Sequence, residues 1–331
     1  MKKIDAFLRR ELRKTFRHAQ VGFVIDDIQP YDSALASVRM RCYDMIEEFE
    51  RQGIKAELYR PLKKYKFVIF TKTISESAVK LSGRLKKKGV IVIDDTYYEA
   101  LLAPENKNDE KRWRVLQIVK NADEVCTCSP QQQQDFSSFH DDVHLISESV
   151  HGSFFKVEKQ HEKKESVTLV YCGYSKKAKD TLCIEEVMKR LQEKYSCRLL
   201  YICESDPKLE GLDYQFVKYD QRRIPTQLLE GDIMIAPRPM EGIEKLAHSF
   251  TKVAYPLAVG IPAVASPVPS YVGTPVMLCH NDEEWYNTLE KLILDEKLRQ
   301  EKGQEGRKYV RAFYSVPYIA DKYIQIMKKY M

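Results

Sequence analysis

The alternation of short apolar runs with helical patterns constrains the fold of this 331-residue chain more than any other feature. In the first half, the apolar runs that predict β-strands lie at 20–26, 54–59, 66–71, 90–95, 123–129 and 142–150. The helical patterns between them lie at 32–53, 75–89 and 108–122. We expect Asp32 with Ser33 to cap the first helix and Ser75 to cap the second. Gly53 and Gly89 are expected to end these helices.

A second series of the same kind follows a polar segment. Its predicted strands lie at 167–174, 197–203, 214–219, 232–237 and 261–266, and the tail beyond residue 282 is nearly all helical. Strands joined by helices imply right-handed crossovers and parallel sheets covered on both faces. We therefore predict an α/β chain with two doubly wound, Rossmann-like domains. Ligands are expected at the carboxyl ends of the strands, in the crevice between the domains.

The composition places the chain in a reducing compartment. No run approaches the ~18 apolar residues of a membrane-spanning helix, and the start of the chain lacks a secretory signal. The eight cysteines are scattered without a C-x-x-C pair, so we expect buried free thiols and a cytoplasmic location.

The net charge of +6 is unevenly spread, because residues 1–18 carry many basic side chains. The cations of this segment are Lys2, Lys3, Arg9, Arg10, Arg13, Lys14 and Arg17. Its apolar residues fall on one helical face, at Ile4, Phe7, Leu8, Leu12 and Phe16. The segment is therefore either a helix that lies on an anionic membrane surface or an amphipathic helix packed on its own domain.

Several nucleotide-dependent and hydrolytic classes are excluded by missing motifs. No G-x-G-x-x-G follows a predicted strand, and neither a P-loop nor a G-x-S-x-G elbow is present. No cluster of His, Cys and carboxylate residues has zinc spacing, so we expect no metal site.

The stretch "AHSFTKVAYPLAVG", 247–260, predicts a phosphate site. It places Ser249, Thr251 and Lys252 at the start of a helix, where free backbone N–H groups and the helix dipole favour an anion. Pro256 is expected to bend this helix, and Gly260 to end it. A buried strand, "IPAVAS", follows at once.

This stretch, with the strand "GDIMIAPRP" before it, resembles the donor-binding element of the retaining GT-B glycosyltransferases that use nucleotide-sugars. The loop "YCGYSKKAKD" resembles their phosphate-binding "G…K" loop, which begins at Gly173. The order and spacing of such motifs cover nearly the whole chain. The resemblance implies a first domain at 1–152 with a returning C-terminal helix at 316–331, a linker at 153–165 and a donor domain at 166–315.

The resemblance also implies a set of donor-binding residues. Lys179 is the best match to the family's loop lysine and Lys177 the second, and Lys252 and Arg238 would add positive charge. The backbone tip around Phe250 would face the diphosphate, together with the hydroxyls of Ser249 and Thr251. Tyr219 and Asp220 would flank the nucleotide base. Each lysine has the alternative of a solvated surface charge.

One departure from the family concerns its two donor-site glutamates. The position of the second is Tyr255 here, and the first would fall near Ala247. Glu241 or Glu244 is expected to substitute for the first. Without them, contacts to the donor sugar are altered and retention of configuration is not implied.

Acceptor residues are expected at the strand ends of the first domain. Asp94 and Asp95 end a strand, where one of them would orient or deprotonate the acceptor hydroxyl; turn capping is the alternative. Arg39 and Arg41 are spaced two apart, so at most one should reach the crevice. Arg39 either holds an anionic acceptor or is exposed to solvent. Asp32 and Tyr97 complete the predicted acceptor set.

The sequence thus predicts a metal-independent glycosyltransferase without a cofactor. It would transfer sugar from a nucleotide-sugar to a glycan or lipid-linked acceptor, at the inner face of a membrane if residues 1–18 bind there. The alternatives are a GT-B shell that binds without catalysis and a sugar-nucleotide epimerase. We expect no nucleic-acid partner, because no reader motif is present.

Overall fold

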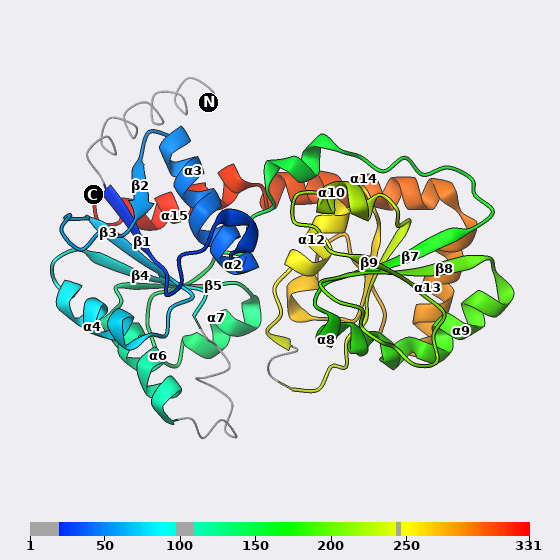
Figure 1. Ribbon diagram of the computed structural model, residues 1–331, viewed down its shortest axis with the longest axis horizontal. Helices are drawn as coiled ribbons and strands as arrows, with labels where there is room; N and C mark the ends of the chain where they lie inside the picture. The colour runs from blue at the N-terminus through cyan, green and yellow to red at the C-terminus, as the bar shows by residue number, and fades with distance from the viewer. Residues whose placement is uncertain (1–19, 97–108, 243–245) are drawn as a thin grey trace. The chain divides into compact units, whose positions relative to one another are not determined.

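The computed structural model describes residues 20–96, 109–242 and 246–331, which form two compact units. Unit 1 comprises the described residues up to Ser149 together with Val316–Met331, and unit 2 is Val150–Ser315. Each unit is built on a six-stranded sheet whose paired strands are all parallel (Figure 1). The predicted pair of doubly wound α/β units is confirmed.

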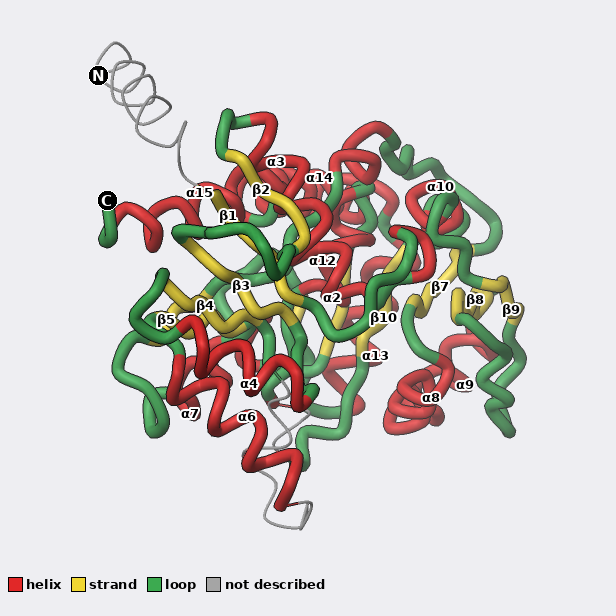
Figure 2. Tube along the Cα trace, turned by 60° about the vertical axis from the view of Figure 1, so that its left-hand side comes forward, coloured by secondary structure: helices red, strands yellow, loops and turns green. Residues whose placement is uncertain are grey.

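The sheet of unit 1 has the strand order β2-β1-β3-β4-β5-β6. Its strands are β1 (Gln20–Val24), β2 (Lys55–Leu58), β3 (Phe67–Thr71), β4 (Val90–Asp94), β5 (Glu124–Thr127) and β6 (Val143–Leu145). Its helices are α2 (Ala36–Val38), α3 (Asp44–Arg51), α4 (Glu76–Leu85), α6 (Asp109–Asn121), α7 (Pro130–Phe136) and α15 (Val316–Lys328). Helices α3 and α15 cover one face of the sheet, and α4 and α6 cover the other (Figures 1 and 2).

Two of the predicted helix boundaries are confirmed. The Ser75 hydroxyl accepts a hydrogen bond from the Ala78 N–H at 3.1 Å and caps α4. Gly53 has φ 82°, which is the left-handed conformation expected of a glycine just beyond α3.

Two other predicted boundaries are wrong. Asp32 and Ser33 lie in a short 3-10 turn, Tyr31–Ser33, and the helix begins later, at Ala36, without a side-chain cap. The residue that turns the chain after α4 is Lys87, with φ 68°, rather than Gly89.

A π-helical turn, Arg39–Tyr43, joins α2 to α3 and buries two arginines. The Arg41 guanidinium forms an ion pair with Asp94 of β4 and donates a hydrogen bond to the Tyr323 hydroxyl of α15 at 3.1 Å. Arg39 is also buried and donates to the Ala34 carbonyl. The expectation that Arg39 is exposed to solvent is therefore wrong, because its side chain ties the preceding loop to the helix.

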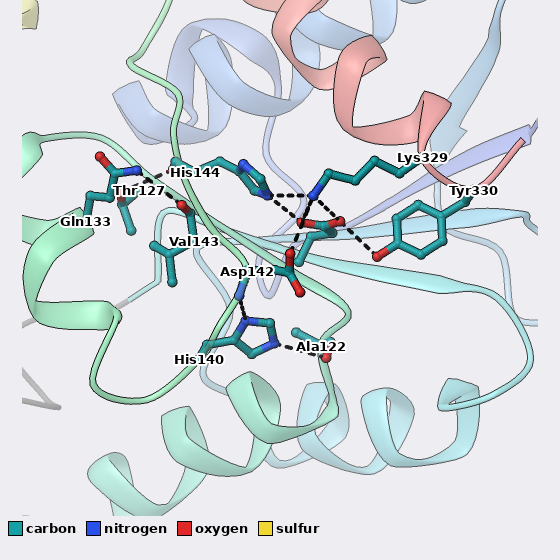
Figure 3. Close-up of polar contacts among 10 residues, drawn as sticks. Ala122, Thr127, Gln133, His140, Asp142, Val143, His144, Lys329 and Tyr330 are labelled. Atoms are coloured by element: carbon teal, nitrogen blue, oxygen red, sulfur yellow. Dashed lines mark hydrogen bonds and ion pairs between the residues drawn. The ribbon is translucent and has the colours of Figure 1, made fainter.

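The end of the chain is fastened to unit 1 by a buried carboxylate (Figure 3). Glu124 accepts from Lys329 Nζ at 3.0 Å and from the Tyr330 hydroxyl at 2.8 Å, and it also contacts His144. Glu124, Asp142 and His144 bring possible metal-ligating atoms within 4.8 Å of one another. The Lys329 ammonium lies among them, 3.5 Å from both Asp142 and His144, and supplies a positive charge there.

The sheet of unit 2 has the strand order β12-β11-β10-β7-β8-β9. Its strands are β7 (Val167–Cys172), β8 (Cys197–Cys203), β9 (Gln215–Lys218), β10 (Ile233–Ala236), β11 (Ala263–Ala265) and β12 (Met277–Leu278). Its helices are α8 (Ser175–Ala178), α9 (Glu185–Lys194), α10 (Ile224–Leu228), α12 (Thr251–Ala258), α13 (Asp282–Leu294) and α14 (Glu296–Phe313). Alternate residues of β7 serve the two faces: Val170 packs with α12, and Leu169 packs with α9 and α13.

The polar segment at 151–166 is tied to unit 2. Lys159 is buried, with Nζ 2.9 Å from Asp232, and it donates to the Leu229 carbonyl. His161 contacts the Gly260 carbonyl at 2.9 Å. Because these contacts are long-range, the sequence pattern of this segment gave no sign of them.

All eight cysteines are free, and six of them are buried, as expected. Cys172 is half-buried, and Cys183 is exposed. Within the three described stretches, no helix combines the length and the apolarity needed to cross a membrane.

Candidate functional site

Helix α12 begins at the carboxyl edge of the unit 2 sheet, as predicted, and its first turn organises the candidate site. Thr251 is its first residue, and Gly260, with φ 84°, turns the chain just beyond its end. The helix contains Pro256. The Val253 and Ala254 N–H groups both bond to the Phe250 carbonyl, and the helix start carries the positive end of the helix dipole.

Lys252 reaches from the first turn of α12 to the end of strand β7. Its Nζ donates to the Cys172 carbonyl at 3.2 Å and lies 3.4 Å from the centroid of the Tyr171 ring. Burial lowers the pKa of Lys252 to about 7, and the neighbouring Arg238 guanidinium contributes to this shift. The ammonium is thus held by a carbonyl dipole and a π face, both of which are neutral.

Arg238 adds a second buried cation, two residues beyond β10. Its side chain is 5% exposed, and NH2 lies 3.9 Å from Asp180. Its backbone N–H donates to the Ser266 hydroxyl at 2.8 Å, which fixes the loop after β10 against the end of β11. Asp180 at this distance offsets only part of the positive charge in the site.

His248 and Lys177 extend the basic group. Lys177 Nζ lies 3.4 Å from His248 Nε2. Burial lowers the pKa of His248 to about 2, and the positive charges of Arg238, Lys177 and Lys252 lower it further in the same direction. The imidazole is therefore neutral at physiological pH, and its Nε2 accepts from the Lys177 ammonium.

The two loop lysines are placed differently. Lys177 is half-buried against His248, whereas Lys179 is exposed at the start of the 3-10 segment Lys179–Ile184. The structure therefore brings Lys177 into the basic group and leaves Lys179 outside it. Gly173 lies inside it, since a β-carbon there would meet Lys252 Nζ at 2.8 Å.

The remaining predicted donor residues surround this group. The Ser249 hydroxyl donates to that of Thr251 at 3.3 Å, and both residues are half-buried. The Phe250 side chain is in the core, stacked on Tyr314 with ring centroids 4.4 Å apart, so only its backbone can face a ligand. Tyr219, just beyond β9, donates its hydroxyl hydrogen to Gln221 at 2.6 Å.

The predicted acceptor residues lie in unit 1. Asp94 is fully buried, and both its oxygens are engaged, one by Arg41 and the other by the Tyr323 hydroxyl at 2.8 Å. Asp95 has φ 47°, and its carboxylate lies 3.6 Å from the ammonium of Lys72, whose φ is 50°. Two such residues at adjacent strand ends mark local backbone strain.

The structure says less about the other residues that were predicted to bind the acceptor. Asp32 is exposed, in the turn that precedes α2. Tyr97 and Glu244 lie outside the described residues, as does the segment 1–18. Glu241 is described and exposed.

Tyr255, at the position of the family's second glutamate, turns an aromatic ring into unit 2. It stacks on Phe154 with ring centroids 4.2 Å apart. No carboxylate is presented from this position of α12.

Taken together, the site has the chemistry of an anion receptor. Lys252, Arg238 and Lys177 carry positive charge beside a helix amino terminus, and Arg238 lies 3.9 Å from the carboxylate of Asp180. Diphosphates bind to such combinations of N–H groups and cations.

Three residues of the basic group around Lys252 could not be assigned correctly from the sequence. His248 lies in the stretch 247–260, but the sequence pattern predicts no role for it, and the pattern favours Lys179 over Lys177. Tyr171 was missed because a tyrosine inside an apolar strand pattern carries no signal that its ring faces a lysine. Only the loop geometry after β7 decides which lysine turns inward.

Comparison with known proteins establishes the fold. No family model and no curated protein sequence matches the chain. Among solved structures, sucrose-phosphate synthase from Thermosynechococcus elongatus matches with a TM-score of 0.68 at 13% identity, over 94% of this chain and 99% of that one. Anabaena HepE, in complex with UDP and glucose, matches with a TM-score of 0.66 at 12% identity, over 94% of this chain and 100% of that one.

A glycosyltransferase from Rickettsia africae matches with a TM-score of 0.58 at 13% identity, over 94% of this chain and 98% of that one. The predicted GT-B fold is therefore confirmed, with α15 packed on the sheet of unit 1. At these identities the likeness concerns the fold.

Proposed function

We propose that the chain is a glycosyltransferase that binds a nucleotide-sugar through its diphosphate at the amino end of α12. The observation that carries this proposal is the convergence of Lys252, Arg238 and Lys177 on that helix start, where Asp180 lies 3.9 Å from Arg238. The complex of the structurally similar HepE with UDP and glucose supports a uridine nucleotide as the first donor to test.

The proposed chemistry needs this positive charge. Transfer breaks the bond between the anomeric carbon and the diphosphate, so negative charge grows on the leaving diphosphate. Lys252 and the α12 N–H groups would stabilise that charge without a metal ion. Preorganised donors of this kind are worth roughly 3–4 kcal/mol each in the transition state.

For the acceptor, Asp95 is a better candidate base than Asp94. Asp94 has both oxygens engaged in a buried network, whereas the ion pair of Asp95 with Lys72, at 3.6 Å, is longer. The proton of the acceptor hydroxyl would pass to the Asp95 carboxylate as the new glycosidic bond forms. The proposed acceptor is a glycan or a lipid-linked glycan, reached at the inner face of a membrane through residues 1–18.

A second function is favoured by Tyr255. A site that lacks the carboxylate at this position of α12 fits a protein that binds a nucleotide-sugar without transferring it. Binding of a donor with neither transfer nor hydrolysis, over a wide donor panel, would favour this reading. Scrambling of the donor sugar without an acceptor would instead indicate an epimerase.

The test is a thermal-shift screen with UDP-, GDP-, ADP- and CMP-sugars, because a ligand that binds only the native state raises its apparent stability. We expect a shift with at least one uridine nucleotide-sugar and its loss in Lys252→Ala. Lys291→Ala, an exposed lysine of α13, is the matched control and should keep the shift. An unchanged shift in Lys252→Ala would remove Lys252 from the site.

A further inference from the structure

Seven exposed lysines gather at the amino edge of the unit 1 sheet, the edge opposite the strand ends that carry Asp95. They lie at the starts of β2 to β5 or in the segments that lead into them. We call them the amino-edge lysines: Lys55, Lys64, Lys66, Lys86, Lys87, Lys88 and Lys120.

The strand register makes these residues neighbours. Lys55 is opposite Gln20, the first residue of β1, and Phe67, which follows Lys66, is opposite both Val21 and Val90. The Val90 N–H bonds to the Lys66 carbonyl at 2.8 Å, so the Lys86–Lys88 turn lies beside β3. Lys86 Nζ in turn donates to the Lys120 carbonyl at 3.1 Å. The amino-edge lysines therefore line one continuous rim.

No carboxylate among the described residues pairs with these lysines. None of the amino-edge lysines forms an ion pair with any residue in the described part of the chain. By contrast, Lys63 lies 2.7 Å from Glu57, and Lys329 lies 3.0 Å from Glu124. The edge also carries carboxylates: Asp123 accepts from the Ile91 N–H at 2.7 Å and Glu50 from the Ala56 N–H at 2.9 Å, so two negative charges offset part of the seven positive ones.

Two further features of this edge indicate what binds there. Strand β1 begins at this edge, with Gln20, and the chain before it has a sequence, 1–18, that combines basic residues with five apolar residues at helical spacing. Leu62, 99% exposed, lies two residues before Lys64. Lysines together with exposed apolar residues suit a lipid surface, where ammonium groups meet headgroup phosphates and apolar side chains enter the acyl boundary.

We propose that the amino-edge lysines form a membrane-docking surface for anionic lipid headgroups, which acts together with residues 1–18. Stable attachment of a peripheral protein usually takes two signals, and the chain offers a basic rim and, in the sequence before β1, a basic and apolar segment. Each lysine near an anionic bilayer contributes a similar increment of attraction, which salt screens.

The docking surface also limits which acceptor molecules are possible. This step rests on the proposed function. Strand β4, Val90–Asp94, separates the amino edge from Asp95, and five residues span about 17 Å. A docked unit 1 thus holds Asp95 away from the headgroups by about that distance. The acceptor hydroxyl would then belong to a glycan that extends from the membrane, and not to a lipid hydroxyl at its surface.

The test is co-sedimentation of the full-length protein with vesicles, without any donor. The vesicles are phosphatidylcholine alone or phosphatidylcholine with phosphatidylglycerol, at low and high salt. The variant carries Lys55→Gln, Lys66→Gln, Lys86→Gln and Lys88→Gln. The matched control removes the same charge from exposed lysines of unit 2, with Lys163→Gln, Lys291→Gln, Lys297→Gln and Lys308→Gln.

We expect wild-type protein to bind the anionic vesicles in a salt-sensitive way and the neutral ones far less. The amino-edge variant should bind the anionic vesicles about tenfold more weakly or worse, with an unchanged circular dichroism spectrum and melting temperature. The unit 2 control should bind as wild type does. Equal binding by the variant, an equal loss in the control, or binding of DNA in place of vesicles would overturn the proposal. Because no donor is used, these outcomes are independent of the glycosyltransferase assay.

Discussion

The ammonium group of Lys252 lies 3.4 Å from the centroid of the Tyr171 ring, with the Cys172 carbonyl at 3.2 Å as its hydrogen-bond acceptor. Neither partner carries a negative charge. A buried ammonium whose direct partners are both neutral is costly, and the cost appears as a pKa lowered to about 7, although the more distant Asp180 offsets a little of it. An incoming diphosphate would supply the missing negative charge and restore the protonated state.

This relationship predicts proton uptake on nucleotide binding. At pH 8 the free lysine is largely neutral, and the bound one is protonated, so UDP should bind with uptake of close to one proton. UDP affinity should fall as the pH rises above 7. Titration calorimetry in buffers of different ionisation enthalpy measures the uptake directly. In Lys252→Arg, which stays charged, the uptake should disappear while binding persists.

The same shift affects the stability of the free protein. The folded-state pKa of Lys252 is lower than the ordinary 10.5, so between about pH 7 and 10.5 the unfolded chain binds more protons. The contribution of Lys252 to the free energy of unfolding therefore increases with pH across this window. Below pH 7 both states are protonated and the contribution is constant.

A second prediction separates the two loop lysines. Lys177 is half-buried beside His248, at 3.4 Å, and Lys179 is exposed. We expect Lys177→Ala to weaken UDP binding about tenfold and Lys179→Ala to weaken it less than about twofold, because a solvated charge contributes little. Titration calorimetry at pH 7 with both variants is the measurement. A larger effect at Lys179 would restore the assignment that the sequence pattern favours.

These residues also show what the sequence can predict. The order of strands and helices follows from apolar periodicity, and the end of α12 follows from Gly260 and the strand after it, because these signals are local. Lys177 lies in the short helix α8 and contacts His248, which is 71 positions away, so no local pattern predicts its orientation. The Arg41–Asp94–Tyr323 network joins residues more than 200 positions apart, so no local pattern encodes it.

That network leads to a third prediction. Asp94→Asn leaves the Arg41 guanidinium buried without its counter-charge. Removal of one partner of a buried ion pair costs about 3–5 kcal/mol, so unit 1 should unfold at markedly lower denaturant concentration. Urea unfolding followed by circular dichroism measures the loss.

Asp95→Asn is the comparison for this variant, since the Asp95 ion pair with Lys72 is longer, at 3.6 Å. It should change stability by less than about 1 kcal/mol and lower transfer activity if Asp95 is the acceptor base. A stable but inactive Asp94→Asn protein would contradict the structural role of Asp94 and return it to the catalytic set.

A final prediction concerns the packing that holds α12 in place. A β-carbon on Gly303 of α14 would collide with the Gly260 carbonyl, at the turn that follows α12. Gly303→Ala should therefore separate the two segments and destabilise the protein by about 1–3 kcal/mol.

The matched control is Gly83→Ala in α4, where the new methyl group meets only Asn121 Nδ2, at 3.8 Å. An alanine in an open helix position reduces the freedom of the unfolded chain, so this control should be more stable than wild type by about 0.5–1 kcal/mol. We expect the urea midpoint to fall in Gly303→Ala and to rise in Gly83→Ala. An unchanged midpoint in Gly303→Ala would show that the contact between α14 and the Gly260 turn relaxes freely.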